Sequence, residues 1–254
     1  MNLSSITPVV LTWNEAPNLG RCLDGLRWAD HVIVLDSGST DETQAICAGY
    51  RNVELAERPF DNHTAQWNHG VSLAPTDWIL SLDADYGIRE EFVRELEEID
   101  PAVGHSAWYA PFRFLIHGRP LRGSLYPPRA VLFDKSRCRY RSDGHTQLLE
   151  ISGSSGHMIS KIDHDDRKPL ARWLDSQRKY ALLEAEKLLV PDGPHGLADR
   201  LRRMIWPAAP VVFVYTLIVK GAIFDGWPGW YYVFQRTCAE VILSLVLLEK
   251  RFLK

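Results

Sequence analysis

The first 85 residues alternate between short apolar runs and segments with apolar residues at helical spacing. The apolar runs cover residues 6–12, 31–35, 53–57 and 78–82. Short β-branched runs separated by helical patterns are typical of consecutive β-α-β units. The pattern therefore predicts a parallel, doubly wound α/β sheet whose strands end, along one edge, at Thr12, Asp36, Glu57 and Asp83.

Helices are expected between these strands, around residues 19–26, after the turn at 37–43 and at 65–73, and a further amphipathic helix at 89–99. Asn14 is a plausible N-cap for the first helix. Beyond residue 100, the apolar segments 106–117 and 129–133 predict additional strands, and 169–189 predicts a long helix. We therefore expect a mixed, mainly parallel sheet flanked by helices in a catalytic domain over residues 1–190.

The tail at 191–254 has a different pattern. Residues 208–219 are apolar but short and contain Pro210, and the run at 230–248 is interrupted by Gln235, Arg236 and Glu240. A membrane-spanning helix needs about 20 apolar residues. We therefore predict amphipathic helices that lie on a membrane surface, with ordinary helical core or a homodimer face as the alternatives.

Composition supports a folded protein with an uneven charge distribution. The chain has 254 residues, 46% of them hydrophobic, and a net charge of −3. Residues 1–160 hold 14 basic and 21 acidic side chains, whereas 161–254 hold 15 and 11. Because the basic end is also the apolar end, we expect an anionic membrane surface as partner and no nucleic acid.

The cysteines and the N-terminus point to the cytoplasm. The four cysteines are widely scattered, so we expect free thiols in a reducing compartment. The first residues lack the basic and apolar regions of a signal peptide. The predicted location is cytoplasmic, peripheral on the inner face of the cytoplasmic membrane.

Two acidic segments are candidates for metal binding. Asp83 and Asp85 follow the predicted strand at 78–82, where alternation along an extended chain would point both carboxylates to one side. Such a pair suits a divalent cation, Mg²⁺ or Mn²⁺, although a solvated acidic turn is the alternative. His164, among three aspartates at 163–166, is a further metal-ligand candidate or part of a solvated loop. The polar segment 143–147 predicts a surface turn or a site loop.

Three motifs together resemble the inverting glycosyltransferases of family 2, which have the GT-A fold. The motifs are Leu-Thr-Trp-Asn-Glu at 11–15, Val-Leu-Asp-Ser-Gly-Ser-Thr-Asp at 34–41 and Leu-Asp-Ala-Asp at 82–85. The resemblance covers about residues 5–185 and is strongest to the lipopolysaccharide-core glucosyl- and heptosyltransferases, whose tail resembles residues 224–229. It implies transfer of a sugar from a nucleotide-diphosphate donor, UDP-type favoured, to a glycan or lipid-linked acceptor of the cell envelope.

The resemblance also implies roles for individual residues. Asp85 would be the direct metal ligand and Asp83 would lie near the ribose and the metal. The remaining candidates would bind the nucleotide sugar, and they are Thr12, Asn14, Glu15, Asp36, Arg58, Gln66 and Asn68.

The sequence departs from the family pattern at the segment that would carry the catalytic base. Relatives often have Val-His-Glu, with the acid as the base, where this chain has Asp-Gly-His-Thr-Gln at 143–147. Asp143 is the first candidate, His145 the second and Glu150 the third. A second departure is Tyr86, which follows the Asp-x-Asp motif where relatives commonly carry an acid.

Other functions fit the motifs less well. Phosphoryl transfer by an aspartate nucleophile would place Asp-x-Asp after the first strand, with Thr or Val at the position of Gly87. A sugar nucleotidyltransferase would have a Gly-rich, basic loop after that strand, which residues 12–19 lack. A non-catalytic nucleotide-sugar or lipid-binding module also stays open.

Overall fold

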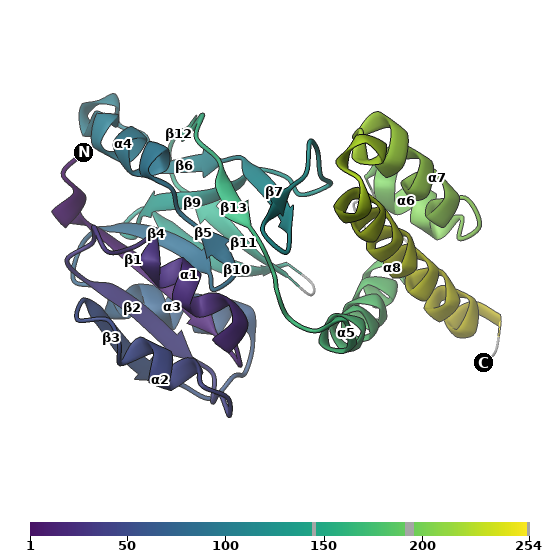
Figure 1. The fold of residues 1–254 in the computed structure, drawn as a ribbon, viewed down its shortest axis with the longest axis horizontal. Helices are drawn as coiled ribbons and strands as arrows, with labels where there is room; N and C mark the ends of the chain where they lie inside the picture. Colours follow the sequence, from purple (N-terminus) through teal and green to yellow (C-terminus); the bar gives the residue numbers. More distant parts are fainter. Residues whose placement is uncertain (144–145, 191–195, 253–254) are drawn as a thin grey trace. The chain divides into compact units, whose positions relative to one another are not determined.

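The computed structural model describes residues 1–143, 146–190 and 196–252 (Figure 1). The chain forms two compact units, which we describe separately. Unit 1 comprises Met1–Phe114 and Tyr126–Arg167, and unit 2 comprises Leu115–Leu125 and Lys168–Lys254. The chain passes from one unit to the other after residues 114, 125 and 167. The domain boundary predicted from the sequence lies at residue 190 and stays a prediction.

Unit 1 is built on a seven-stranded sheet with the order β12-β6-β9-β4-β1-β2-β3. Its strands are β1 Ile6–Thr12, β2 Val32–Asp36, β3 Val53–Glu57, β4 Trp78–Asp83, β6 Ala107–Ala110, β9 Arg129–Asp134 and β12 Ser155–His157. β1 pairs in parallel with β2 and β4, and β3 extends the parallel half, whereas β9 is antiparallel to both β4 and β6. The predicted mixed, mainly parallel sheet is therefore confirmed.

Helices cover both faces of this sheet (Figure 1). They are α1 Ala16–Asp24, α2 Thr43–Cys47, α3 His63–Leu73 and α4 Glu90–Glu98, with short 3₁₀ turns at Leu3–Ser5 and Pro101–Val103. One core cluster joins α1 and α4 to one face, and another joins α3 to the other face. α3 lies close to β1 because Gly70 has no side chain: a Cβ there would lie 2.9 Å from Val9 Cγ1.

Two smaller groups of strands complete unit 1. They comprise β5 Tyr86–Gly87, β7 Phe112–Ile116, β10 Cys138–Asp143, β11 Thr146–Ile151 and β13 Ile162–His164. β13 pairs in parallel with the start of β7 and antiparallel with β5. β10 and β11 form an antiparallel hairpin. β5 directly follows the Asp-x-Asp motif, so β13 runs alongside the candidate metal site.

Two local predictions were wrong for identifiable reasons. The strand expected at 106–117 is divided at Pro111, which has no N–H to donate to a neighbouring strand. Asn14 is not the N-cap of α1: Glu15 holds that position, and Asn14 has a left-handed φ of 54°.

Unit 2 is mainly helical and includes the short strand β8 Arg119–Pro120. Its helices are α5 Leu170–Leu189, α6 Leu197–Arg203, α7 Ala208–Val214, a π-helical turn Tyr215–Val219, a 3₁₀ turn Ala222–Asp225 and α8 Trp227–Phe252. In the part of the chain that the structure describes, α8 is the one helix that is long and apolar enough, by length and composition alone, to cross a membrane.

The four cysteines are free, as predicted.

An ion-pair cluster joins the helices of unit 2. The Arg202 guanidinium on α6 lies 2.7 Å from Glu240 on α8 and 3.4 Å from Glu184 on α5, and both glutamates are buried. Burial alone would lower the pKa of Arg202, but Glu240 and Glu184 together raise it. One guanidinium therefore pairs with two buried carboxylates from two helices.

Replacing Arg202 with leucine should destabilise unit 2, because Glu184 and Glu240 would lose their shared cation. We expect a loss of about 2–3 kcal/mol, below the full cost of breaking a deeply buried pair since Arg202 is partly exposed. Urea unfolding followed by circular dichroism measures it. The exposed Arg200 on the same helix is the matched control, and Arg200→Leu should change the free energy of unfolding by less than about 0.5 kcal/mol. Equal effects of the two variants would refute the role given to the cluster.

Candidate active site

The carboxyl ends of three parallel strands bring the predicted site residues to one edge of the sheet. Thr12 at the end of β1 is in register with Asp36 at the end of β2, and Leu11 is in register with Asp83 at the end of β4. In open parallel sheets, ligands bind outside the carboxyl ends of the strands. The strand ends therefore meet as the sequence predicted.

Asp36 is fully buried and organises the loop that follows β2. Its carboxylate accepts hydrogen bonds from the Thr12 hydroxyl at 3.0 Å, the Ser39 N–H at 2.7 Å, the Gly38 N–H at 3.1 Å and the Gln44 amide at 3.2 Å. Burial alone would raise the pKa of Asp36, but the hydrogen bonds from Ser39, Gln44 and Thr12 lower it. Asp36 is thus an ionised anchor that determines the shape of the loop at 37–44.

The loop after β1 is joined to the same segment. The Asn14 side-chain oxygen accepts from the Thr40 N–H at 2.7 Å, and the Asn14 N–H donates to the Ser39 hydroxyl at 2.7 Å. The Glu15 N–H donates to the Thr43 hydroxyl at 2.7 Å. Asn14 therefore links two loops, which explains its left-handed backbone, since asparagine tolerates that conformation better than most residues.

Asp83 and Asp85 affect the same buried side chains, although they are not alternate residues of one extended strand as predicted. β4 ends at Asp83, and Ala84 and Asp85 form a turn, so the alternation of an extended strand does not apply to the second carboxylate. Both charges act on the same buried side chains: with burial, they raise the pKa values of Cys22, Tyr86 and Tyr126. Asp83 and Asp85 therefore act on one shared group of buried side chains.

His164, at the end of β13, contacts Asp85. The imidazole Nε2 lies 3.2 Å from Asp85 Oδ2, and each side chain is 14% exposed. The rings of Phe114, Tyr126 and Tyr86 surround the imidazole at centroid distances of 4.6, 4.7 and 5.4 Å. These aromatic contacts restrict the orientation of the histidine, so the pair presents an oxygen and a nitrogen donor side by side.

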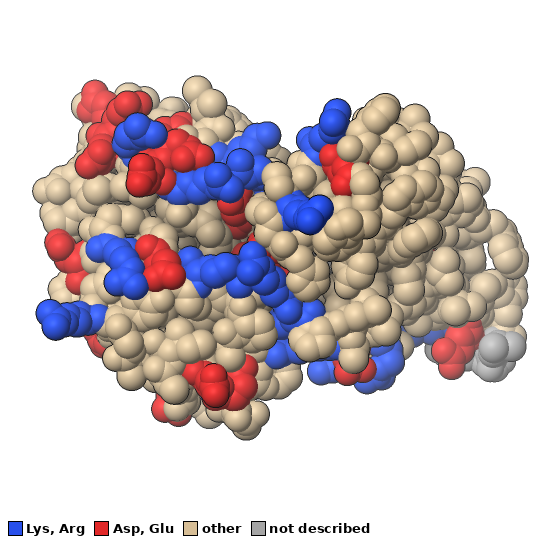
Figure 2. All heavy atoms as spheres, in the orientation of Figure 1, with Lys and Arg blue, Asp and Glu red and all other residues tan. Residues whose placement is uncertain are grey.

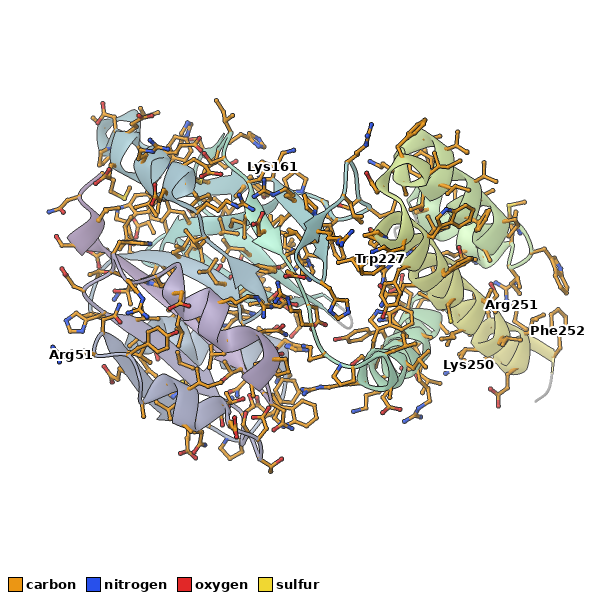
Figure 3. The ribbon with its side chains drawn as sticks, in the orientation of Figure 1. Arg51, Lys161, Trp227, Lys250, Arg251 and Phe252 are labelled. Atoms are coloured by element: carbon orange, nitrogen blue, oxygen red, sulfur yellow. The ribbon has the colours of Figure 1, made fainter. Side chains whose placement is uncertain are left out.

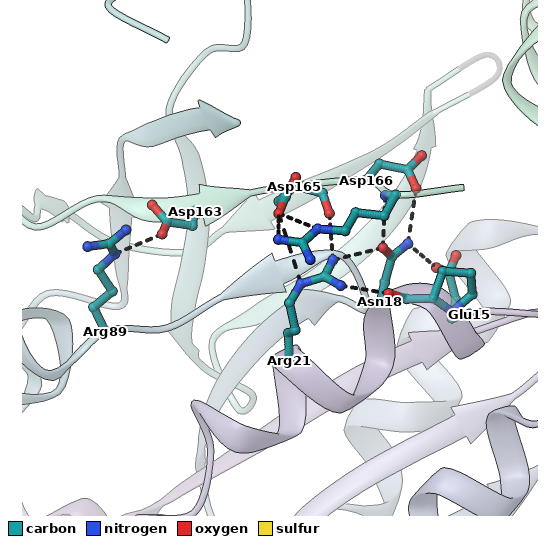
Figure 4. A network of polar contacts seen from close by, with 9 residues as sticks. Glu15, Asn18, Arg21, Arg89, Asp163, Asp165 and Asp166 are labelled. Atoms are coloured by element: carbon teal, nitrogen blue, oxygen red, sulfur yellow. Dashed lines mark hydrogen bonds and ion pairs between the residues drawn. The ribbon is translucent and has the colours of Figure 1, made fainter. Parts of the chain in front are cut away.

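Ion pairs position the segment that carries His164 (Figure 4). On one side of the histidine, Asp163 binds Arg89 at 2.8 Å and Arg113 at 2.6 Å. Asp163 and Asp165 are buried, and the Asp165 N–H donates to the Asp85 carbonyl at 3.0 Å. The solvated-loop alternative for these residues is therefore wrong.

On the other side of His164, the chain is joined to α1 (Figure 4). Asp165 accepts from Arg167 at 2.8 Å, and the Arg21 guanidinium donates to the Asp165 carbonyl at 2.9 Å. The buried Asn18 amide donates to Asp166 at 3.0 Å and to Glu15 at 2.9 Å. Glu15 is thereby connected to the segment that carries His164.

The donor set of Asp85 and His164, with Asp83 nearby, fits a divalent cation that is completed by a substrate. Among the residues that the structure describes, no group of three or more His, Cys, Asp or Glu side chains is arranged to hold a metal ion. Mg²⁺ is usually held by one or two carboxylates together with waters and substrate phosphates, and imidazole with carboxylate also suits Mn²⁺. Asp85 and His164 therefore offer one oxygen and one nitrogen ligand, and a cation bound there would need further ligands.

The remaining nucleotide-sugar candidates lie directly after β3 and within α3. Arg58 forms a two-pronged ion pair with Asp61 and donates to Gln66, whose amide donates to Ser37 at 2.8 Å. Gln66 thus connects the loops after β2 and β3. Asn68 binds the backbone of Tyr140 in both directions, at 3.0 and 3.1 Å, which is a structural contact with β10. Its part in donor binding stays a prediction.

The base candidates lie on the β10–β11 hairpin. His145 and the side chain of Asp143 lie outside the described residues. Glu150 is exposed, pairs with Arg141 at 2.7 Å and is opposite Arg139, away from the turn of the hairpin. It also lines a surface hollow of about 860 Å³ together with Lys135 and Arg137. Glu150 is therefore engaged by Arg141, and its role as a base stays a prediction.

Two further side chains at this edge were not predicted. Trp13 directly follows β1 and is 51% exposed. Arg129 begins β9, lies 4.7 Å over the Tyr126 ring, and its pKa is raised by the charges of Tyr86, Tyr126 and Asp83 against the effect of burial. The sequence signal for Trp13 was its position at a strand end. Arg129 had no such signal, because it reaches the site from the opposite end of an antiparallel strand.

A family model and several known proteins match parts of this sequence. The family model described as glycosyl transferase family 2 matches residues 7–143. An uncharacterized glycosyltransferase of Rickettsia felis is 35% identical over 98 residues, which are 38% of this chain and 34% of that protein. The lipopolysaccharide core biosynthesis glycosyltransferase LpsC of Rhizobium meliloti is 25% identical over 102 residues, 39% of this chain and 36% of that protein. The chain thus matches about a third of the length of each relative.

A solved structure shares the overall fold. The crystal structure of S. aureus TarS 1-349 has a TM-score of 0.50 and 12% sequence identity, and the match covers 98% of this chain and 92% of that chain. The mixed, mainly parallel sheet flanked by helices corresponds to the GT-A fold implied by the sequence motifs. Because the family model covers more than half of the sequence, the chain belongs to glycosyl transferase family 2.

Proposed function

We propose that this glycosyltransferase transfers a sugar from a nucleotide-diphosphate donor, UDP-type favoured, to a hydroxyl of a glycan or lipid-linked acceptor in cell-envelope polysaccharide synthesis, with inversion. One observation carries the proposal. The carboxyl ends of β1, β2 and β4 gather Thr12, Asp36 and Asp83 at the edge where His164 contacts Asp85. This edge combines a loop suited to a nucleoside with a donor set suited to a cation and a diphosphate.

The nucleoside would bind at the loops after β1 and β2. Asp36 holds the 37–44 loop through its hydrogen bonds, and Asn14 joins that loop to residues 13–15. The exposed Trp13 ring offers a surface on which a base can stack, and Glu15 offers a carboxylate to ribose hydroxyls or to a base N–H. Thr12 contributes by orienting Asp36.

Asp85 and His164, with Asp83, would hold Mg²⁺ or Mn²⁺. A bound cation would stabilise the negative charge that develops on the diphosphate as the sugar leaves. Arg129, near Asp83, offers a guanidinium to the same phosphates or to an anionic acceptor, and Arg58 is a second candidate. The ion pairs of Asp163 and Asp165 keep His164 in position while these ligands bind.

Transfer requires a base at the acceptor. The acceptor oxygen forms a bond to the anomeric carbon on the side opposite the diphosphate, the bond from that carbon to the phosphate oxygen breaks, and the base takes the hydroxyl proton. Products are the glycosylated acceptor and the nucleoside diphosphate. We retain Asp143 as the first base candidate and His145 as the second.

We place the reaction at the inner face of the cytoplasmic membrane, with the tail at 191–254 on an anionic lipid surface. The similarity to LpsC and the apolar helix α8 support this location. A non-catalytic module that binds nucleotide sugars or lipids, and a sugar nucleotidyltransferase, are the alternatives to transfer. A turnover assay with donor and acceptor distinguishes them from the proposed function.

Replacing Asp85 should weaken UDP binding in the presence of Mn²⁺. We expect Asp85→Asn and His164→Gln each to reduce the affinity at least about tenfold, since even the outer partners of metal ligands typically change metal affinity by about 10–100-fold. Isothermal titration calorimetry of UDP with and without Mn²⁺ measures the effect. The wild type should bind UDP more weakly when the metal is removed.

The matched control is Asp77→Asn, because Asp77 is an exposed aspartate at the opposite end of β4. Its affinity for UDP should equal that of the wild type. The metal assignment is wrong if UDP binds the wild type equally well without Mn²⁺, or binds Asp85→Asn as tightly as the wild type.

Replacing the base should lower turnover without changing donor binding. We expect Asp143→Asn to reduce the turnover number by about 10²–10⁴-fold, the usual contribution of general base catalysis, while the Kd of UDP stays constant. Steady-state kinetics with a matched acceptor, together with calorimetry, separates the two quantities. Glu150→Gln tests the third candidate and should retain turnover when Asp143 is the base, because Glu150 is exposed and paired with Arg141. Unchanged turnover in Asp143→Asn would transfer the role to His145.

A further inference from the structure

Helix α8 has two chemically distinct faces. Its buried face carries Tyr232, Val233, Glu240, Leu243 and Leu247, which pack against the other helices of unit 2. The opposite face exposes a series of large apolar side chains that are three, four or seven residues apart along the helix. They are Trp227, Trp230, Phe234, Val241, Leu245 and Phe252, with exposed fractions from 37% to 71%.

Figure 3 labels the first and last residues of this series: Trp227 lies at one end of α8, and Phe252 lies at the other end, next to Lys250 and Arg251. The half-buried Cys238 and Leu248 fill the gaps in the repeat. We call this series the α8 stripe. Its spacing follows the helical period over the full length of α8, which is unusual for a surface exposed to water.

The segment before α8 adds a second apolar surface in the same unit. α7 and the π-helical turn expose Val211, Val214, Tyr215, Ile218 and Val219, again at helical spacing. Phe224, in the turn that leads into α8, is 71% exposed, and Phe213 contacts Trp230 at a centroid distance of 6.4 Å. Figure 2 shows a broad surface over the helical region with few charged side chains. The apolar surface of unit 2 is therefore formed by α8 together with α7 and the π-helical turn.

Cations border this apolar surface and contact its aromatic rings. Arg119 lies 5.5 Å from the centroid of Trp227, Arg122 lies 5.4 Å from Phe224, and Lys220 lies 5.7 Å from Tyr215. Tryptophan and tyrosine beside lysine and arginine are typical of side chains located at the headgroups of a bilayer. A second copy with the same patch would place cations near cations, whereas an anionic surface complements them.

The buried face of α8 argues against a helix that crosses the bilayer. Glu240 lies near the middle of α8 and is paired with Arg202 of α6, and α5 packs on the same side through Ala181, Ala185 and Leu188. α5 exposes charged side chains such as Arg178, Lys179 and Glu186. Charged groups at the centre of a bilayer are costly, and this ion-pair cluster belongs to the protein core. The helix is therefore apolar toward one side only.

We infer that unit 2 binds an anionic bilayer with the α8 stripe and the exposed side chains of α7 and the π-helical turn inserted at the headgroup boundary, so that α8 lies in the membrane plane and does not span it. The occupant of this surface is a lipid bilayer that contains negatively charged headgroups. The inference deepens the proposed function, on which it rests for its biological role, but it depends on different residues from the donor site.

Co-sedimentation of the full chain with vesicles tests the inference. The probes are vesicles of phosphatidylcholine alone and of phosphatidylcholine mixed with phosphatidylglycerol. We expect binding to the mixed vesicles that weakens with added salt, and at least about a tenfold loss of binding in the double variant Phe234→Glu, Leu245→Glu. An alkaline wash should release the bound protein from membranes of expressing cells, since a spanning helix would stay inserted.

The control variant is Leu183→Glu, because Leu183 is 45% exposed on α5, away from the residues that α5 packs against α8. It should bind mixed vesicles like the wild type, and circular dichroism should show that all variants fold. Equal binding by the double variant, retention after the alkaline wash, or a dimer in analytical ultracentrifugation that the double variant abolishes would each overturn the inference. UDP calorimetry on the same variants separates this result from the donor site, because the double variant should bind UDP normally.

Discussion

The parallel register of β1 against β2 and β4 determines where the charged side chains of the active site lie. Thr12, Asp36 and Asp83 are far apart in the sequence but end their strands at one edge. A shift of one residue in a strand would turn every side chain to the other face of the sheet. The apolar residues packed on both faces prevent such a shift, because Val9 and Val10 pack into opposite core clusters. The core thereby specifies the geometry of the site.

The site also depends on a segment that returns to it from far along the chain. This segment includes β13, which pairs with β5 and β7 outside the seven-stranded sheet. The ion pairs of Asp163 and Asp165 hold the chain on both sides of His164. Several of these pairs are partly buried and share partners, so they act as a network and not as isolated surface ion pairs. Their physical consequence is order: the ion pairs restrict the position of the segment that carries His164 beside Asp85.

Unit 2 uses polar contacts differently. The Arg202 cluster joins three helices and leaves the opposite side of α8 apolar. Placing the charges on the inner face and the aromatic residues on the outer face reverses the usual pattern of a soluble helix. Residues 227–252 have the length and hydropathy of a membrane-spanning helix. One side of α8 nevertheless packs against other helices of unit 2.

Sequence patterns by themselves determined the βα units, the positions of β1 and β3 to the residue, the long helix near 170–189 and the family to which the chain belongs. These features follow from local periodicity and from strand ends that topology brings together. Only the tertiary structure showed that Asp85 lies in a turn, that Asn14 links two loops, and that Arg129 and His164 reach the site from β9 and β13. Such positions depend on antiparallel pairing and on contacts between residues more than 70 positions apart in the sequence, as between Arg89 and Asp163, and local propensity carries no record of them.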